Sequence, residues 1–318
     1  MAQRTGPTSK IWRNGSLIDW DDANVHVMAH AIHYGSSVFE GMRCYEGPQH
    51  GSVFRLREHM RRLHDSAKIY RLPLPYSIDE LMAATVETIA ANGLKECYLR
   101  PLVARTGQQM GIFAPDAPVD VFIICWEMGQ HLDQAALEQG ADVRVSSWRR
   151  AAPNTFPTLA KAGGNYLNSQ LTMYEARQDD YFEGIMLDYA GFVAEGSGQN
   201  LFVIRDNVIY TAPLSSGILH GITRASIMQI ADDLGYPVRE MTMPREFLYL
   251  ADELFFCGTA VEIAPIRSVD QLPVGAGKPG PITTAIRERF MGIVKGRLPD
   301  THSWLTPVPV AEAAAGSR

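Results

Sequence analysis

The stretch Pro157–Tyr166, "PTLAKAGGNY", places a lysine in surroundings that are unusual for a lysine. Lys161 lies between Ala160 and Ala162, whereas the other lysines lie in or near polar stretches or loops, where solvated surface charge explains them. A lysine among small apolar residues is expected to be desolvated, which lowers the pKa of its ammonium group. The free amine that results is the form that reacts with carbonyl compounds. A loop lysine that reaches out to solvent is the alternative.

Residues around this lysine and farther along the chain suit a planar ligand. Two glycines follow Lys161 and permit close backbone approach, and Tyr166 could donate a hydrogen bond to a ligand oxygen. Farther on, "VAEGSGQNLF" sets Glu195 at the end of an apolar strand. A carboxylate is costly there unless it is paired, and a protonated ring nitrogen would pair with it.

Three other stretches suit anionic groups: the first and the third a phosphate, and the second an oxyanion or a carboxylate. "HGITRASI" starts a helix whose first amides lack intrahelical acceptors, and "CGTAVE" forms a turn of small residues with Thr259 and Ala260. "EHMRRL" supplies Arg61 and Arg62, either of which could reach a phosphate. An amine, a phenol, an acid for a ring nitrogen and a phosphate site are together what pyridoxal 5′-phosphate requires of a protein.

Composition bounds the class of protein. The 318 residues are enough for two packed domains, and a hydrophobic content of 46% provides a core. The net charge of −6 argues against nucleic-acid binding, which needs a basic face. The four cysteines form no C-x-x-C pair, so we expect free thiols in a reducing compartment and no zinc site. Without an apolar leader or membrane helix, we expect a cytoplasmic protein.

Local patterns predict mixed helices and strands. An amphipathic helix over 77–93 has Ser77 as its cap and Glu80 at the capping-box position. A hairpin is expected on Asn14-Gly15, and further turns near 190–191 and 206–207. Helices are also expected within 53–70, over 165–178 with Leu167, Leu171 and Tyr174 on one face, and over 222–235; strands are expected at 97–106, 119–128, 141–148 and within 254–269.

The chain is expected to form two domains. We expect a smaller domain over 10–128, an interdomain loop over 129–138 and a larger domain over 139–306. The polar ends, 1–9 and 307–318, are expected to be disordered.

Two motifs are expected to mislead. "GAGKPG", residues 275–280, matches the dinucleotide fingerprint, but a proline lies inside the turn and no acidic partner follows about 20 residues on. We interpret it as a loop before the last helix. The histidines of "HVMAHAIHYG" have metal-like spacing, but no carboxylate or cysteine completes the set, so structural roles are expected for them.

Long motifs make the chain similar to a known family. "RRAAPNTFPTLAKAGGNYL", "EGSGQNLF", "GITR", "HYGSSVFEGMRCY" and "FRLREHMRRLHDSAKIY" resemble the branched-chain amino acid aminotransferases of bacteria. The similarity runs from about Ile11 to about Leu305. It implies an α/β (α+β), two-domain fold-type IV pyridoxal-phosphate enzyme, with a small N-terminal α/β domain and a larger pseudobarrel domain.

The resemblance implies roles at the cofactor. Lys161 would carry pyridoxal 5′-phosphate and shuttle a proton between substrate Cα and cofactor C4′. Glu195 would keep the pyridine nitrogen protonated, and Tyr166 would hydrogen-bond O3′. The residues that would bind the phosphate are Arg62, Ile222, Thr223 and Thr259.

The resemblance also implies a substrate pocket. Tyr98 and the amides of Thr259 and Ala260 match the α-carboxylate site, and Arg100 matches the arginine that accepts the distal carboxylate of glutamate. The side-chain pocket would be lined by Tyr34, Phe39, Gly41, Met110, Ile112 and Trp126. In the family the equivalents of Tyr34 and Ile112 come from the partner subunit. One departure is His131, which stands where close relatives carry a tyrosine that helps close the pocket.

The expected activity is a ping-pong transfer of the amino group between L-leucine, L-isoleucine or L-valine and 2-oxoglutarate. The alternatives of the same fold are a D-amino-acid transaminase, an aminodeoxychorismate lyase and an (R)-selective amine transaminase. A non-catalytic pyridoxal-phosphate binder and a dehydrogenase remain as alternatives of other classes. Partners are expected to be amino acids, 2-oxo acids and further copies of the chain, as a dimer or a hexamer built as a trimer of dimers.

Overall fold

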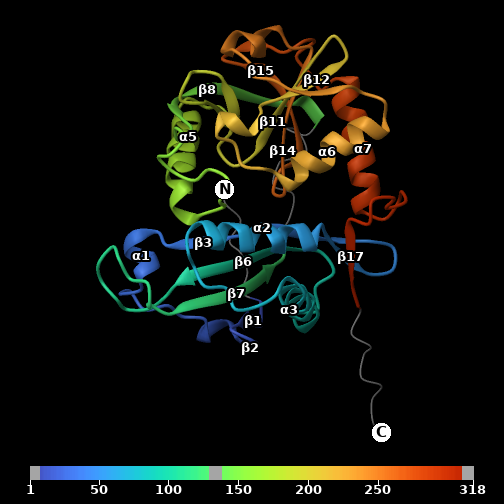
Figure 1. The fold of residues 1–318 in the computed structure, drawn as a ribbon. Coiled ribbons are helices and arrows are strands. Elements are labelled where there is room, and N and C mark those ends of the chain that lie inside the picture. The colour runs from blue at the N-terminus through green and yellow to red at the C-terminus, as the bar shows by residue number, and fades with distance from the viewer. Residues whose placement is uncertain (1–7, 129–137, 310–318) are drawn as a thin grey trace. The chain divides into compact units, whose positions relative to one another are not determined.

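The structure is a computed structural model that describes residues 8–128 and 138–309. The chain forms two compact units (Figure 1). The described part of the first unit comprises 8–128, 160–164 and 292–309, and that of the second comprises 138–159 and 165–291. The predicted interdomain loop lies, except for Glu138, outside the described residues, as does most of the predicted disorder at both ends.

The first unit is built on a sheet of eight strands among the described residues, ordered β17-β5-β4-β6-β7-β1-β2, with β3 paired to β6. Its strands are β1 (Lys10–Arg13), β2 (Ser16–Asp19), β3 (Ser37–Phe39), β4 (Met42–Glu46), β5 (Gly51–Phe54), β6 (Cys97–Arg105), β7 (Val119–Trp126) and β17 (Leu305–Val308). Its α-helices are α1 (His30–Tyr34), α2 (Leu56–Ile69) and α3 (Ile78–Ala91).

Successive side chains of the central strands point to opposite faces of this sheet. Alternate residues of β6 and β7, such as Leu99 and Ile123, form one core with Leu63 of α2 and Leu81 of α3. The intervening residues, such as Arg100, therefore point to the opposite face. The predicted capping box of α3 is confirmed, since Ser77 and Glu80 bond reciprocally.

The second unit contains a sheet that closes on itself. Its strands are β8 (Ala141–Arg149), β9 (Glu183–Leu187), β10 (Val193–Gly196), β11 (Asn200–Arg205), β12 (Val208–Thr211), β13 (Val238–Glu240), β14 (Glu253–Gly258), β15 (Glu262–Val269) and β16 (Leu272–Pro273). The order β10-β9-β8-β15-β14-β11 becomes a ring because β10 also pairs with β11, at Glu195 and Asn200. Apolar side chains fill this barrel, so the predicted α/β fold with a pseudobarrel is confirmed.

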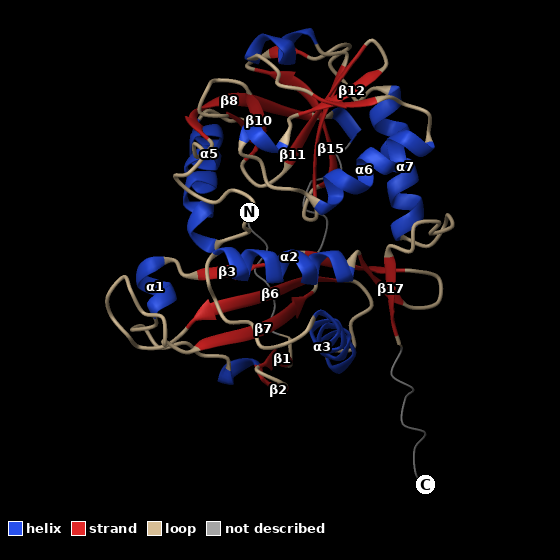
Figure 2. Cartoon of the chain, viewed as in Figure 1, coloured by secondary structure: helices blue, strands red, loops and turns tan. Residues whose placement is uncertain are grey.

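Helices α5 (Tyr166–Gln178) and α6 (Ile222–Asp233) lie outside the barrel (Figure 2). The last helix, α7 (Pro281–Val294), follows the "GAGKPG" loop, as expected, and its first amides bond to Glu253. The turns predicted at 190–191 and 206–207 are present, with left-handed residues at Gly191, Asp206 and Asn207. No helix among the described residues has the length and apolar character to cross a membrane.

The face of α5 predicted from its apolar spacing is exposed. Leu167, Leu171 and Tyr174 are 64%, 42% and 71% exposed, whereas small residues such as Thr172 face the barrel. Helix and strand approach closely there, since a Cβ on Gly184 of β9 would lie 2.6 Å from Thr172 Cγ2. The helix was thus predicted correctly, and its apolar face is the exposed one.

The compact units differ from the expected domain boundaries in two segments. Residues 160–164 belong to the first unit, where Ala162 pairs with Val38, although the sequence placed them in the larger domain. Residues from 292 onward also belong to the first unit because β17 pairs with β5. The disorder expected from 307 is wrong for Pro307 and Val308, which are strand residues.

Candidate active site

The segment that carries Lys161 is fixed by its backbone to the first unit. Lys161 N donates to Ser66 Oγ at 3.0 Å, and Phe39 N donates to Lys161 O at 3.0 Å. The Lys161 side chain is half-buried, and its Nζ lies 5.0 Å from the centroid of the Phe39 ring. A Cβ on Gly163 would lie 2.6 Å from Ser37 Oγ, so this glycine is required by the protein's own packing.

A buried charged cluster joins Glu40 to the helix that carries Ser66. Arg62 of α2 donates through Nε to Glu40 Oε1 at 2.6 Å and through Nη2 to Glu40 Oε2 at 2.8 Å. His59 Nδ1 lies 2.7 Å from Glu40 Oε2. Burial opposes ionisation of Glu40, but Arg62 and His59 hold the pKa of its carboxyl far below the ordinary value. Burial, with Arg62 and Lys161 nearby, lowers the pKa of His59, which favours its neutral form.

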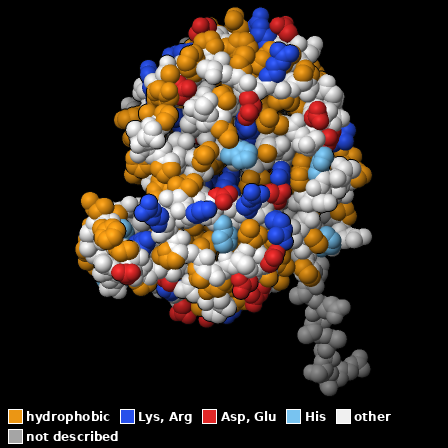
Figure 3. Space-filling model, in the orientation of Figure 1, with side chains coloured by type: hydrophobic (Ala, Val, Ile, Leu, Met, Phe, Trp, Pro, Cys, Tyr) orange, Lys and Arg blue, Asp and Glu red, His pale blue; other side chains and the backbone are white. Residues whose placement is uncertain are grey.

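Basic side chains gather along the stretch of the surface where α2 runs (Figure 3). Helix α2 carries four basic residues, Arg57, Arg61, Arg62 and Lys68. Such a group raises the local concentration of anions.

Aromatic rings surround Arg100 on the other face of the first unit's sheet. The guanidinium carbon of Arg100 lies 4.5 Å from the Phe39 ring centroid, 5.6 Å from that of Tyr98 and 6.0 Å from that of Trp126. A Cβ on Gly41 would lie 2.1 Å from Tyr98 Oη. Five of the predicted pocket residues are therefore adjacent. Among the described residues, buried Arg100 Nε has no hydrogen-bond acceptor, which is expected of a group that waits for an anionic ligand.

Tyr34, Met110 and Ile112 form a separate group at the loop beside α1. Tyr34 Oη accepts from Gly111 N at 3.2 Å, and Ile112 is 89% exposed. His30 joins the same loops through Ser36 and the Gly111 carbonyl, which confirms a structural role for that histidine. His131, predicted at the pocket, lies outside the described residues.

In the second unit, Glu195 of β10 is a buried carboxylate with its partners in place. It lies 3.1 Å from Arg150 Nε, accepts from Asn200 Nδ2 at 2.9 Å, and accepts from Leu219 N at 3.2 Å. Glu195 as a whole residue is only 5% exposed. An ionised carboxylate held in this way in a low-dielectric setting can stabilise a ring N–H⁺.

The start of α6 lies beside that acid. Asn200 Nδ2 also donates to Leu219 O at 3.0 Å, and a Cβ on Gly221, the N-cap of α6, would lie 1.9 Å from Asn200 Oδ1. Ile222 and Thr223 are the first helical residues, and both are buried. Their amides have no acceptor within the helix, which makes this end suitable for a phosphate.

The other predicted residues of the second unit lie at chain turns. Thr259 and Ala260 fall in the connection from β14 to β15, and both are half-buried. Tyr166 is the first residue of α5 and is half-buried.

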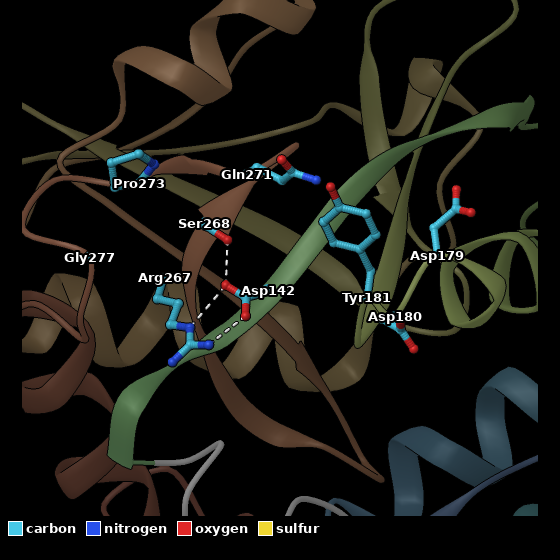
Figure 4. A pocket seen from close by; sticks show the side chains of 9 residues that line it. All are labelled: Asp142, Asp179, Asp180, Tyr181, Arg267, Ser268, Gln271, Pro273 and Gly277. Carbon is cyan, nitrogen blue, oxygen red and sulfur yellow. Dashed lines mark hydrogen bonds and ion pairs between the residues drawn. The ribbon is translucent and has the colours of Figure 1, made fainter.

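The second unit also contains a polar cavity of about 540 Å³, and its lining residues differ from the predicted site residues (Figure 4). Its lining includes Asp142, whose carboxylate bonds to Arg267 and Ser268. Asp179, also in the lining, pairs with Arg144. Asp142, Arg267 and Asp179 are thus already paired, and none of the predicted site residues that the structure describes lines this cavity.

Comparison with known proteins identifies the family. The family model described as amino-transferase class IV matches residues 37–269. The branched-chain-amino-acid aminotransferase of Escherichia coli (strain K12) is 53% identical over 299 residues, which is 94% of this chain and 97% of that protein. The chain belongs to the class IV aminotransferase family.

Solved structures of branched-chain amino acid aminotransferases are also similar to this chain. A crystal structure of the Escherichia coli branched-chain amino acid aminotransferase has a TM-score of 0.93 and 52% identity, covering 95% of this chain and all of that one. The T.th. branched-chain amino acid aminotransferase complexed with N-(5′-phosphopyridoxyl)-L-glutamate has a TM-score of 0.90 and 42% identity, covering 95% of this chain and 99% of that one.

The residues present fit pyridoxal 5′-phosphate, the cofactor of this family. Glu195 offers a buried carboxylate for the ring nitrogen, and the start of α6 offers amides without helical acceptors. Arg62 is held by a carboxylate on one edge of its guanidinium group. Lys161 lies between two buried alanines.

Sequence reasoning missed the residues that hold these groups in place, namely Glu40, His59, Ser66, Arg150 and Asn200. A signal existed for all five, since each lies in one of the long motifs quoted above; Arg150 and Asn200, for example, lie in "RRAAPNT" and "EGSGQNLF". Glu40 stands in the apolar run "SSVFEGM", where an acid must have a partner.

Proposed function

We propose that the protein is a branched-chain-amino-acid aminotransferase. It transfers the amino group of L-leucine, L-isoleucine or L-valine to 2-oxoglutarate in two half-reactions of a ping-pong cycle. The observation that carries the proposal is the buried carboxylate of Glu195 with Arg150 and Asn200 around it. Strong support comes from 53% identity to a protein of that name over nearly the whole chain.

The cofactor, when bound, supplies a protonated pyridine ring that withdraws electrons from the substrate Cα. Glu195 keeps the ring nitrogen protonated, because its own negative charge is fixed by Arg150. Tyr166 donates to O3′. Lys161 holds the cofactor through its amine and then moves the proton between Cα and C4′. The phosphate is held by Arg62, Ile222, Thr223 and Thr259.

The substrate is oriented by a second set of residues. Tyr98 and the amides of Thr259 and Ala260 take the α-carboxylate. The rings of Phe39 and Trp126 provide an apolar wall for a branched side chain, and Arg100 takes the distal carboxylate of glutamate. The unsatisfied Nε of Arg100 supports the last role.

We further propose a homodimer at least, and a hexamer built as a trimer of dimers, in the cytoplasm. The exposed apolar side chains of Val27, Ile32, Ile112 and Phe113 support self-association. Four free, buried cysteines support a reducing compartment. Mass measurement in solution would distinguish a chain of 35.2 kDa from its multiples.

The test is the leucine half-reaction. Protein loaded with pyridoxal 5′-phosphate is mixed with L-leucine, and conversion of its visible absorption band to that of the pyridoxamine form is recorded. Lys161→Ala should abolish the conversion, while Lys278→Ala, in the "GAGKPG" loop, should not. No conversion by the unaltered protein would refute the proposal. Faster conversion with D-alanine or (R)-1-phenylethylamine than with L-leucine would assign one of the rival activities.

A further inference from the structure

Glu40 is a buried acid for which the reaction has no direct use. It lies between Phe39 and Gly41, both predicted pocket residues, and it is 0% exposed. Its backbone N donates to Pro101 O at 2.9 Å, which fixes the residue beside β6. A carboxylate in such a place is costly, so its side-chain contacts indicate why it is present.

Both oxygens of Glu40 are engaged with α2. Arg62 binds them through Nε and Nη2, at 2.6 and 2.8 Å, so one whole edge of the guanidinium group is occupied. This two-point contact fixes the plane of the guanidinium group as well as its position. The other edge, which carries Nη1, is thereby directed away from Glu40.

Helix α2 also connects the Glu40–Arg62 pair to the segment that carries Lys161. His59, Arg62 and Ser66 stand at intervals of three and four residues, so they share one face of α2. His59 bonds to Glu40, and Ser66 accepts from the backbone N of Lys161. One helix face therefore presents the phosphate arginine and supports the lysine.

The negative charge of Glu40 does not by itself explain why this residue is buried beside Arg62. A carboxylate next to Arg62 cancels much of the attraction that Arg62 exerts on a phosphate, so electrostatics predicts that removing the negative charge strengthens anion binding. Orientation predicts the opposite, because an arginine that can rotate loses the fixed geometry on which a directional contact depends.

We propose that Glu40 is a positioning residue for the cofactor phosphate, which it serves by fixing the orientation of the Arg62 guanidinium group. The inference rests on the proposed function, in which Arg62 binds the phosphate of pyridoxal 5′-phosphate. Glu40 itself touches neither the cofactor nor the substrate.

The test compares two ligands that differ only in the phosphate. Apo-protein is titrated with pyridoxal 5′-phosphate and with pyridoxal, and the ratio of the two dissociation constants is measured for each variant. Glu40→Gln should weaken binding of pyridoxal 5′-phosphate about tenfold or more and leave that of pyridoxal nearly unchanged, since a hydrogen bond to a charged group is lost. The matched control is Glu58→Gln, also on α2 and paired with Arg55 at the surface.

A double variant tests whether Glu40 acts through Arg62. In Arg62→Met protein, Glu40→Gln should have no further effect on the ratio of dissociation constants. If Glu40→Gln does not fold, Glu40→Asp keeps the charge but withdraws it by one methylene, and a smaller selective loss is expected.

Three results would overturn the inference: tighter binding of pyridoxal 5′-phosphate by Glu40→Gln, equal weakening of both ligands, or an undiminished effect in the Arg62→Met background. The first would mean that Glu40 acts by charge, and the second that it only maintains the fold. If unaltered apo-protein does not prefer pyridoxal 5′-phosphate to pyridoxal, the proposed function fails first, so the two failures are distinguishable.

Discussion

Replacement of Gly221 by alanine should damage the acid site without altering any charged group. The added Cβ would lie 1.9 Å from Asn200 Oδ1, and contacts under 3.0 Å do not persist, so the Asn200 amide must retreat by about 1 Å. Gly221 has φ −67° and ψ 129°, which alanine adopts freely, so the cost comes from this collision and not from backbone strain.

The magnitude follows from what the amide holds. Asn200 donates to Glu195 at 2.9 Å and to Leu219 O at 3.0 Å. Loss of a hydrogen bond to a charged group costs about 1.5–3 kcal/mol and loss of a neutral one about 1 kcal/mol. Alanine also restricts the conformations of the unfolded chain, which raises the free energy of unfolding by about 0.4–1 kcal/mol. The free energy of unfolding should therefore fall by about 1.5–3.6 kcal/mol.

The assay is urea unfolding of the apo-protein, followed by titration with pyridoxal 5′-phosphate. Gly198→Ala is the matched control, because no atom lies within 4 Å of its added Cβ and its backbone is not in the left-handed region. Its stability should stay within about 1 kcal/mol of the unaltered protein. If Gly221→Ala matches Gly198→Ala in both unfolding and cofactor affinity, Asn200 does not hold Glu195 in the way described.

Three further outcomes follow from the geometry. Arg100→Met should slow the half-reaction with 2-oxoglutarate about 100-fold and that with L-leucine less than about tenfold, since only the former loses a charge-assisted pair; single-turnover absorbance with each substrate measures this. The pKa of Glu40 is lowered in the folded protein, so the stability it provides is fully present above the ordinary value of 4.5 and is lost as the pH falls below it. The difference in unfolding free energy between unaltered protein and Glu40→Gln should accordingly be largest near neutral pH and shrink below pH 4.5. Finally, all four cysteines are free and buried, so a thiol reagent should label none quickly in folded protein and four after unfolding in guanidinium; rapid labelling of folded protein would contradict the burial.

Features set by neighbouring residues were predictable from the sequence. The capping box of α3 and the hairpin at Asn14-Gly15 depend on contacts within a few residues, and both are present. The motif-based resemblance supplied the family, since it covered nearly the whole chain.

Long-range pairing was beyond local patterns. Glu40 and Arg62 are 22 residues apart, and no periodicity indicates that one helix face meets that acid. The exposed apolar residues of α5, Leu167, Leu171 and Tyr174, show the same limit: spacing predicts a helix but not which side the barrel receives. The pairing of β17 with β5 likewise joins one segment near each end of the chain, and neither segment alone indicates its partner.

The barrel of the second unit closes through a rung formed by Glu195 and Asn200. The same two residues are joined side chain to side chain. The pairing that closes the seam of the barrel therefore also brings the Asn200 amide to the carboxylate of Glu195. A substitution far from the cofactor that loosens this seam should inactivate the protein while leaving every catalytic side chain present, and slow amide exchange at the rung would report an assembled site.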